Sequence, residues 1–199
     1  MMLRRASARL LIVEDSPLDF AWLQETLQDL YSIKGVYDFD KYEVRRRLPE
    51  VDVALVDMYD DRTHEPKGLE IIGEIVEYGR KRRVPTIVMS SRGRLDRDTL
   101  AKAMQGGGAR DFVWKDDEHA PSKDEFALKI DAALELAAAE GFARSRRRWL
   151  FRTFQSLVVV LAVVSVVLIL KGSERGTLSL ETLLIVLTIA SLPLSERYL

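Results

Sequence analysis

The stretch ALVDMYDD, Ala54 to Asp61, passes directly from a short apolar run into a cluster of acidic residues. A short run that is apolar throughout is typical of a strand in the interior of a parallel sheet. An aspartate at the end of such a strand is often only a turn former, because its side chain can hydrogen-bond its own backbone. Whether Asp57 is more than that depends on what the rest of the chain places beside it.

Three further segments have the same character, being short, rich in Val, Ile and Leu, and bounded by charged residues, Gly or Pro. A fifth segment, 31–39, is a weaker candidate because Gly and Lys interrupt it. Amphipathic stretches separate these segments, and the first begins with Ser16 as N-cap and Pro17 in the first turn. The alternation predicts an α/β fold, a doubly wound five-stranded parallel sheet covered by helices on both faces. The other strands are expected at 8–13, 51–57, 85–91 and 109–115, and the later helices at 69–83, 97–105 and 122–139.

Composition narrows the chemistry that the chain can perform. The 199 residues carry a formal net charge of -1, so no basic excess indicates nucleic acid. The absence of cysteine excludes disulfides, thiol catalysis and Cys-ligated metals, and two histidines, His64 and His119, leave little for a His-based metal site. The apolar run from Leu10 to Val13 is too short for a secretory signal, so this part is predicted to stay in the cytosol.

Polar residues stand at the carboxyl ends of four predicted strands. Glu14 and Asp15 follow the first strand, and Asp57 ends the third. Ser90 and Lys115 end the fourth and fifth. These ends share one edge of a parallel sheet, where three carboxylates would repel one another unless a hard cation such as Mg²⁺ lay between them. A lysine and a hydroxyl nearby supply what a phosphoryl group needs, and a carboxylate can itself be the nucleophile.

In this order the segments resemble the receiver domain of bacterial response regulators. LLIVEDSPLDFAWLQETL is similar to the family's first strand, acidic pair and first helix, and LVD to its phosphoacceptor strand. PTIVMSSRG is similar to the fourth strand with its hydroxyl, and GARDFVWK to the fifth strand with its aromatic residue and lysine. The resemblance covers about residues 8–140 and implies a flavodoxin-like receiver domain, which we expect to span residues 1–141.

The resemblance also implies a phosphoacceptor and a metal site. Asp57 would accept a phosphoryl group from a histidine kinase or a phosphotransfer protein. Asp15, Asp57 and the backbone carbonyl of Tyr59 would hold Mg²⁺ directly, and Glu14 would act mostly through metal-bound water. We expect no enzymatic activity beyond Mg²⁺-dependent phosphorylation and dephosphorylation of the protein itself.

Three further roles follow from the same resemblance. Lys115 would pair with the phosphoryl oxygens, and Ser90 would move to hydrogen-bond them. Phe112 would follow inward and couple phosphorylation to the surface formed by the fourth helix, fifth strand and fifth helix. From the residues alone, Phe112 reads equally well as an ordinary core aromatic.

The sequence departs from the family pattern in two places. The loop MYDDRTHEPKG, residues 58–68, reaches its glycine about three residues late, and Asp60 and Asp61 have no evident role. Asp116 stands where the family has a proline after the lysine. His64 in the loop is interpreted as an exposed histidine rather than a ligand.

After Gly141 the composition changes. An Arg-rich segment, 142–153, precedes an apolar run of about 17 residues without a charge, close to the minimum for crossing a bilayer. We predict transmembrane helices at 154–171 and 178–194, a short external loop at 172–177 and a tail at 195–199. A pair of buried core helices or an oligomerising coil is the alternative, but such helices normally have a polar face.

The arginines beside the first predicted span indicate orientation and output. Basic flanks stay cytoplasmic, so we expect a multi-pass protein of the cytoplasmic membrane with the receiver and both termini in the cytosol. No helix-turn-helix pattern is evident, which favours a membrane or interaction output without nucleic acid. The expected partners are the kinase or phosphotransfer protein, the lipid bilayer and further copies of the chain. Phosphorylation would control the assembly or activity of the hairpin; alternatively the chain is a membrane-tethered adaptor or phosphate sink.

Overall fold

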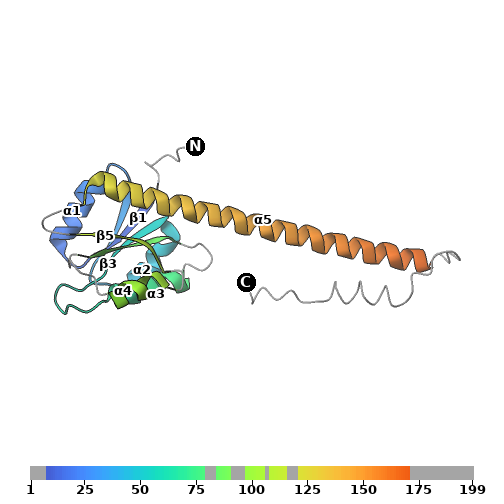
Figure 1. The fold of residues 1–199 in the computed structure, drawn as a ribbon, viewed down its shortest axis with the longest axis horizontal. Coiled ribbons are helices and arrows are strands. Elements are labelled where there is room, and N and C mark those ends of the chain that lie inside the picture. The colour runs from blue at the N-terminus through green and yellow to red at the C-terminus, as the bar shows by residue number, and fades with distance from the viewer. Residues whose placement is uncertain (1–7, 79–83, 91–96, 106–107, 116–120, 171–199) are drawn as a thin grey trace. The chain divides into compact units, whose positions relative to one another are not determined.

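The computed structural model describes residues 8–78, 84–90, 97–105, 108–115 and 121–170 (Figure 1). The chain divides into two compact units, Met1–Ala139 and Glu140–Leu199.

The first unit contains a five-stranded parallel sheet with the strand order β2-β1-β3-β4-β5. Every strand expected from the sequence is present, including the weak second one. The order changes direction between β1 and β3, which makes the sheet doubly wound, as predicted. The strands are β1 (Arg9–Val13), β2 (Ser32–Val36), β3 (Val53–Asp57), β4 (Thr86–Ser90) and β5 (Ala109–Trp114).

The predicted helices also form, and one more is present. Ser16 caps the first helix, because its Oγ accepts a hydrogen bond from the Asp19 amide at 3.3 Å. The unexpected helix, α2, is short and has Val44 as its only buried residue, so it lacks the apolar period that reveals a helix in a sequence. The helices are α1 (Pro17–Leu27), α2 (Lys41–Arg47), α3 (Gly68–Tyr78), α4 (Arg97–Met104) and α5 (Lys123–Leu170), with a 3₁₀ turn at Leu48–Glu50.

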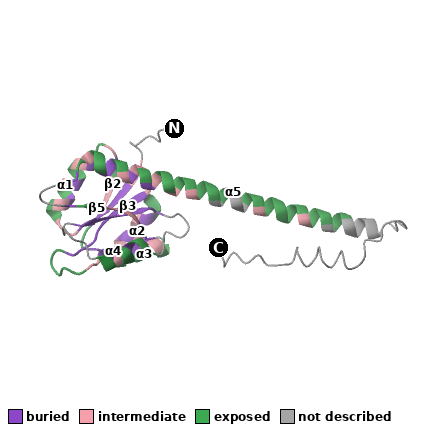
Figure 2. Ribbon diagram, viewed as in Figure 1, coloured by how far each residue is buried: buried purple, intermediate pink, exposed green. Residues whose placement is uncertain are grey.

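Helices cover both faces of the sheet, and the buried residues gather on the strands between them (Figure 2). Successive strand residues point to opposite faces. Leu10 and Ile12 of β1 pack in the cluster with α1 and α5, whereas Leu11 and Val13 pack in the cluster with α2 and α3. Because all four are fully buried, β1 reads as a continuous apolar run rather than as an alternating one.

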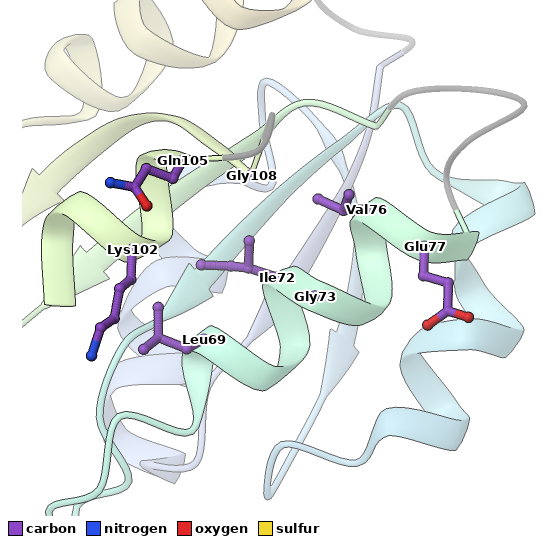
Figure 3. Close-up of a pocket in the computed structure, with 8 residues that line it drawn as sticks. All are labelled: Leu69, Ile72, Gly73, Val76, Glu77, Lys102, Gln105 and Gly108. Carbon is purple, nitrogen blue, oxygen red and sulfur yellow. The ribbon is translucent and has the colours of Figure 1, made fainter. Parts of the chain in front are cut away.

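A groove with a volume of about 360 Å³ lies between α3 and α4 (Figure 3). Leu69, Ile72 and Val76 line it from α3, and Lys102 and Gln105 from α4 and the residue that follows it. None of the residues that line it is one of the acids at the strand ends, so the groove is separate from the site that the sequence indicates.

The second unit contains the rest of α5, which ends at Leu170. Large apolar side chains along it are exposed, among them Phe142, Trp149, Phe154 and Leu157. Within the residues that the structure describes, no helix has a stretch long and apolar enough to cross a membrane. The predicted second span (178–194), the loop (172–177) and the tail (195–199) lie outside the described residues.

Candidate functional site

Three of the predicted acids meet at the point where the strand order reverses. Glu14 and Asp15 follow β1, and Asp57 ends the neighbouring strand β3. Each contributes one carboxylate oxygen to a group that lies within 4.8 Å. Glu14 and Asp57 are buried and Asp15 is half-buried. This switch point is the usual place for a ligand in a doubly wound sheet.

Lys115, directly after β5, reaches into this acidic cluster. Its Nζ lies 2.6 Å from Glu14 Oε2 and 3.1 Å from Asp57 Oδ1. It also donates a hydrogen bond of 2.8 Å to Oδ2 of Asp19, in the first turn of α1. A single lysine therefore forms ion pairs with carboxylates from three different segments of the chain.

The acidic cluster is electrostatically strained, because burial disfavours charged carboxylates. Burial raises the pKa of Glu14 to about 7, and the charge of Asp57 adds to the effect while Lys115 opposes it. Burial raises the pKa of Asp57 to about 6, against the opposing charge of Lys115. For Lys115 burial lowers the pKa, but the charges of Asp57 and Glu14 outweigh it and leave the pKa above that of an ordinary lysine. The cluster thus has more negative charge than its lysine neutralises.

Two buried oxygens of the acidic cluster, Asp15 Oδ1 and Asp57 Oδ1, have no hydrogen-bond partner among the described residues. Asp57 Oδ1 and Lys115 Nζ form an ion pair at 3.1 Å, but not a hydrogen bond. The second oxygens are occupied, since Asp57 Oδ2 accepts from the Tyr59 amide at 3.3 Å and Asp15 Oδ2 from the Asp61 amide at 2.9 Å. Orphaned carboxylate oxygens at this spacing fit a hard divalent cation such as Mg²⁺.

Both oxygens of Glu14 are already bound. Oε1 accepts from the Ser16 amide at 3.2 Å, and Oε2 accepts from Lys115. Direct ligation by Asp15 and Asp57 and an indirect part for Glu14 stay predictions. Ligation by the carbonyl of Tyr59, which is buried beside them, stays a prediction.

The long loop after Asp57 is built around Asp60, whose carboxylate is fully buried. Asp60 Oδ1 accepts hydrogen bonds of 2.9 Å from the amides of Arg62 and Thr63, and Oδ2 pairs with Lys67 Nζ at 2.5 Å. The hydrogen bond from Lys67 is the main reason that the pKa of Asp60 lies well below its usual range. Asp60 is thus the structural centre of this nonstandard loop.

The same loop reaches the acidic cluster through Asp61 and Gly68. The Asp61 amide holds Asp15, while the loop closes on the strand through a 3.0 Å bond from the Gly68 amide to Met58. A Cβ atom at Gly68 would lie 2.3 Å from the carbonyl oxygen of Asp57, so only glycine lets α3 begin this close to the strand end. The side chain of His64 is exposed, as expected.

Ser90 and Phe112 occupy the positions expected for them on β4 and β5. Ser90 is buried, and its carbonyl accepts the Lys115 amide at 2.8 Å. Phe112 is half-buried and packs edge-on against Trp114, with ring centroids 5.1 Å apart. Lys129 of α5 lies over the Phe112 ring, 5.4 Å from its centroid. Their switching roles stay predictions, and Asp116 lies outside the described residues.

Asp19 is the site residue that the sequence analysis missed. By its position it is only an acid in the first turn of a helix, which is favourable at any helix N-terminus. Its spacing of four residues from Asp15, across the junction between a strand and a helix, is a signal that could have placed it near the strand ends.

We expect the metal-free protein to lose stability as the pH rises from about 4 to about 7. The pKa values of Asp57 (about 6) and Glu14 (about 7) lie above those of unfolded carboxyls, so the folded state binds more protons throughout this window. The loss should be on the order of 2–4 kcal/mol in total, since one pKa unit corresponds to about 1.4 kcal/mol and the two groups are coupled.

Urea unfolding in EDTA at pH 4 and pH 8, followed by tryptophan fluorescence, measures this loss. Mg²⁺ added at pH 8 should recover most of it. A stability that stays level or rises between the two pH values would contradict the assignment of these two buried acids.

No protein-family model and no curated protein matches the sequence. Among solved structures, the chain is similar to the signal receiver domain of a modulated diguanylate cyclase from Desulfovibrio desulfuricans G20, with 25% identity and a TM-score of 0.53 over 67% of this chain and 98% of that one.

Two further solved structures match over a similar region. One is the signal receiver domain of a putative Luxo repressor protein from Vibrio parahaemolyticus, with 18% identity and a TM-score of 0.54 over 69% of this chain and 97% of that one. The other is a CheY-like receiver domain protein from Methanospirillum hungatei JF-1, with 16% identity and a TM-score of 0.53 over 68% of this chain and 99% of that one. The described residues up to Ala139 therefore have the fold of response regulator receiver domains.

Proposed function

We propose that this chain is a response regulator of a two-component system and that a histidine kinase or phosphotransfer protein phosphorylates it on Asp57. The observation that carries the proposal is the environment of Asp57. Its buried carboxylate has an oxygen without a hydrogen-bond partner among the described residues, beside Lys115 and two further acids. An aspartate that only forms a turn hydrogen-bonds its own backbone and requires neither a lysine nor two further acids beside it.

The phosphoryl transfer uses groups that lie within reach of one another. A carboxylate oxygen of Asp57 attacks the phosphorus of a phosphohistidine, and the P–O bond forms as the P–N bond breaks. The imidazole nitrogen keeps the electron pair and takes up a proton. Mg²⁺ held by Asp15 and Asp57 would neutralise charge on the phosphoryl oxygens.

The remaining residues of the site would stabilise the phosphorylated product and orient the metal ligands. Lys115 Nζ, already 3.1 Å from Asp57 Oδ1, donates to a phosphoryl oxygen, and the hydroxyl of Ser90 is the second donor. The loop around Asp60 orients Asp15 through the Asp61 amide. We expect no chemistry beyond the gain and loss of this phosphoryl group.

The test is incubation of the purified full-length chain with Mg²⁺ and acetyl phosphate. Mass spectrometry should find one phosphoryl group, mapped to Asp57 and labile to hydroxylamine as an acyl phosphate is. Asp57→Asn should abolish the gain, whereas Asp52→Asn, which alters a carboxylate paired with Arg9 on the same sheet, should not. A wild type that takes up no phosphate, or that is modified elsewhere, would refute the proposal.

We further propose that residues 154–171 and 178–194 form a transmembrane hairpin that holds the receiver at the cytosolic face of the membrane. The exposed apolar side chains of α5, such as Val159, Val160 and Val163, support this proposal. Exposing apolar surface to water costs about 25 cal/mol of free energy per Å². A run of exposed apolar residues is therefore expected to be covered by a bilayer or by another copy of the chain. Arg146 and Arg152 are exposed beside the run, where anionic lipids would meet them.

Carbonate extraction of cell membranes tests the anchor. The full chain should stay in the pellet, and a chain ending at residue 153 should be released. Liposomes loaded with a fluorescent dye then separate the two outputs, because a phosphorylation-controlled hairpin should change leakage or oligomer size on addition of acetyl phosphate. Phosphorylation without either change would favour the membrane-tethered adaptor or phosphate sink.

A further inference from the structure

The ammonium group of Lys115 is shared unequally among its three carboxylates. Nζ donates hydrogen bonds to Glu14 at 2.6 Å and to Asp19 at 2.8 Å, while its contact with Asp57 at 3.1 Å is an ion pair only. A lysine ammonium has three N–H donors. Two of them are therefore committed to residues other than the proposed phosphoacceptor.

The two committed partners differ in their contact with water. The side chain of Glu14 is 0% exposed, so breaking its bond to Lys115 would leave a buried charge without a cation beside it. The side chain of Asp19 is 39% exposed and can be hydrated again when the bond breaks. The hydrogen bond to Asp19 is therefore the one that Lys115 can exchange for a new anion at low cost.

Resting on the function proposed above, we propose that Asp19 is a positioning residue that holds Lys115 at the edge of α1 and thereby limits the rate at which Asp57 is phosphorylated. The bonds to Glu14 and Asp19 fix the orientation of the ammonium, and in this orientation the third N–H makes no hydrogen bond to Asp57 Oδ1 although Nζ lies 3.1 Å away. Lys115 must therefore release Asp19 before it can turn a donor towards an incoming phosphoryl group on Asp57. Asp19 itself touches neither the phosphoryl group nor Asp57 in this scheme. It acts through the lysine that it holds.

Asp19 is well placed for a clean substitution. The backbone amide of Asp19 donates to the Ser16 Oγ, so the helix cap survives when the side chain of Asp19 changes. Because the carboxylate is partly hydrated, its loss leaves no buried unpaired group in its place. We therefore expect Asp19→Asn to fold normally and to free one donor of Lys115.

The experiment measures the initial rate of phosphorylation of the full-length chain in detergent with saturating Mg²⁺ and acetyl phosphate. Asp19→Asn should accelerate the reaction about two- to five-fold, the range expected for losing one partly exposed ion pair. Asp19→Glu keeps the carboxylate and should return the rate towards that of the wild type. Asp29→Asn removes an exposed acid paired with Lys123 at 3.0 Å, outside the site, and should leave the rate unchanged.

Salt separates this mechanism from simple repulsion of the anionic phosphodonor. Repulsion at a distance is screened by high salt, whereas competition for a hydrogen bond within the site persists. An acceleration that survives about 0.5 M salt supports the proposal. An acceleration that disappears there, or an unchanged rate in Asp19→Asn, overturns it.

A second readout does not depend on phosphorylation. In the ¹⁵N NMR spectrum the ammonium of Lys115, held by Glu14 and Asp19, should exchange its protons slowly, and Asp19→Asn should speed that exchange. If the wild type takes up no phosphate, the proposed function fails and this inference fails with it. If the wild type is phosphorylated but neither the rate nor the ammonium signal responds to Asp19→Asn, only the inference about Asp19 is wrong.

Discussion

Replacing Asp57 with asparagine is expected to raise the free energy of unfolding of the metal-free protein by about 1–2 kcal/mol at pH 8, although it removes the proposed phosphoacceptor. Burial raises the pKa of this carboxyl to about 6, so at pH 8 the folded protein holds it ionised at a cost. Asparagine has nearly the same shape and no charge. Part of the gain is offset because its amide no longer attracts Lys115.

The stabilisation by Asp57→Asn should depend on pH and on metal. The difference should shrink as the pH falls through the folded pKa of about 6, and it should largely vanish only below about pH 4, where the carboxyl is protonated in the unfolded state as well. Mg²⁺ should stabilise the wild type at pH 8 and the variant far less, since a proposed ligand is lost. Urea unfolding in EDTA and in Mg²⁺ measures both effects, and a variant less stable than the wild type at pH 8 in EDTA would contradict the account.

Lys115→Met is expected to have the opposite effect, lowering the free energy of unfolding by about 3 kcal/mol at pH 8. Methionine retains an apolar stem of similar length but removes the cation that Glu14 and Asp57 share. Removing one partner of a buried ion pair costs about 3–5 kcal/mol, because the other charge stays buried without compensation. We place the loss at the lower end because the two carboxyls can take up protons instead.

The same unfolding measurements test this prediction. The loss in Lys115→Met should shrink towards pH 5, where Glu14 and Asp57 are protonated in the folded state. Lys123→Met is the matched control, since Lys123 pairs with the exposed Asp29 at 3.0 Å and such surface pairs contribute about 0–1 kcal/mol. An equal loss of unfolding free energy in the two variants would show that Lys115 contributes no more to stability than a surface lysine does.

If Asp57→Asn raises the free energy of unfolding and Lys115→Met lowers it, the acidic cluster is arranged for function at the expense of stability. The excess of negative charge destabilises the metal-free fold, and that excess is what Mg²⁺ and a phosphoryl group would use. A purely structural ion-pair network would lose stability with either substitution.

Much of the fold could be predicted because the strands are buried on both faces. Continuous apolar runs such as Leu10–Val13 predict interior strands without reference to their neighbours, and the helices between them have caps that the sequence displays. Helix α2 escaped prediction because it buries only Val44 and depends on its Asp40 cap and on tertiary packing. Glu14, Asp15 and Asp57 could be predicted because each one ends a strand or follows it within two residues.

The sequence by itself determined the order of strands and helices, and with it the meeting of Glu14, Asp15, Asp57 and Lys115 at one edge, because parallel strands bring their carboxyl ends together. Only the tertiary structure decided which of these groups are bound and which are free. It placed the Asp60 carboxylate at the centre of the loop. It also formed the hydrogen bonds from the Asp61 amide to Asp15 and from Lys115 to Asp19. Such contacts depend on distances of a few ångströms between side chains that are up to about 100 residues apart in the chain, and a pattern of residue types carries no information at that scale.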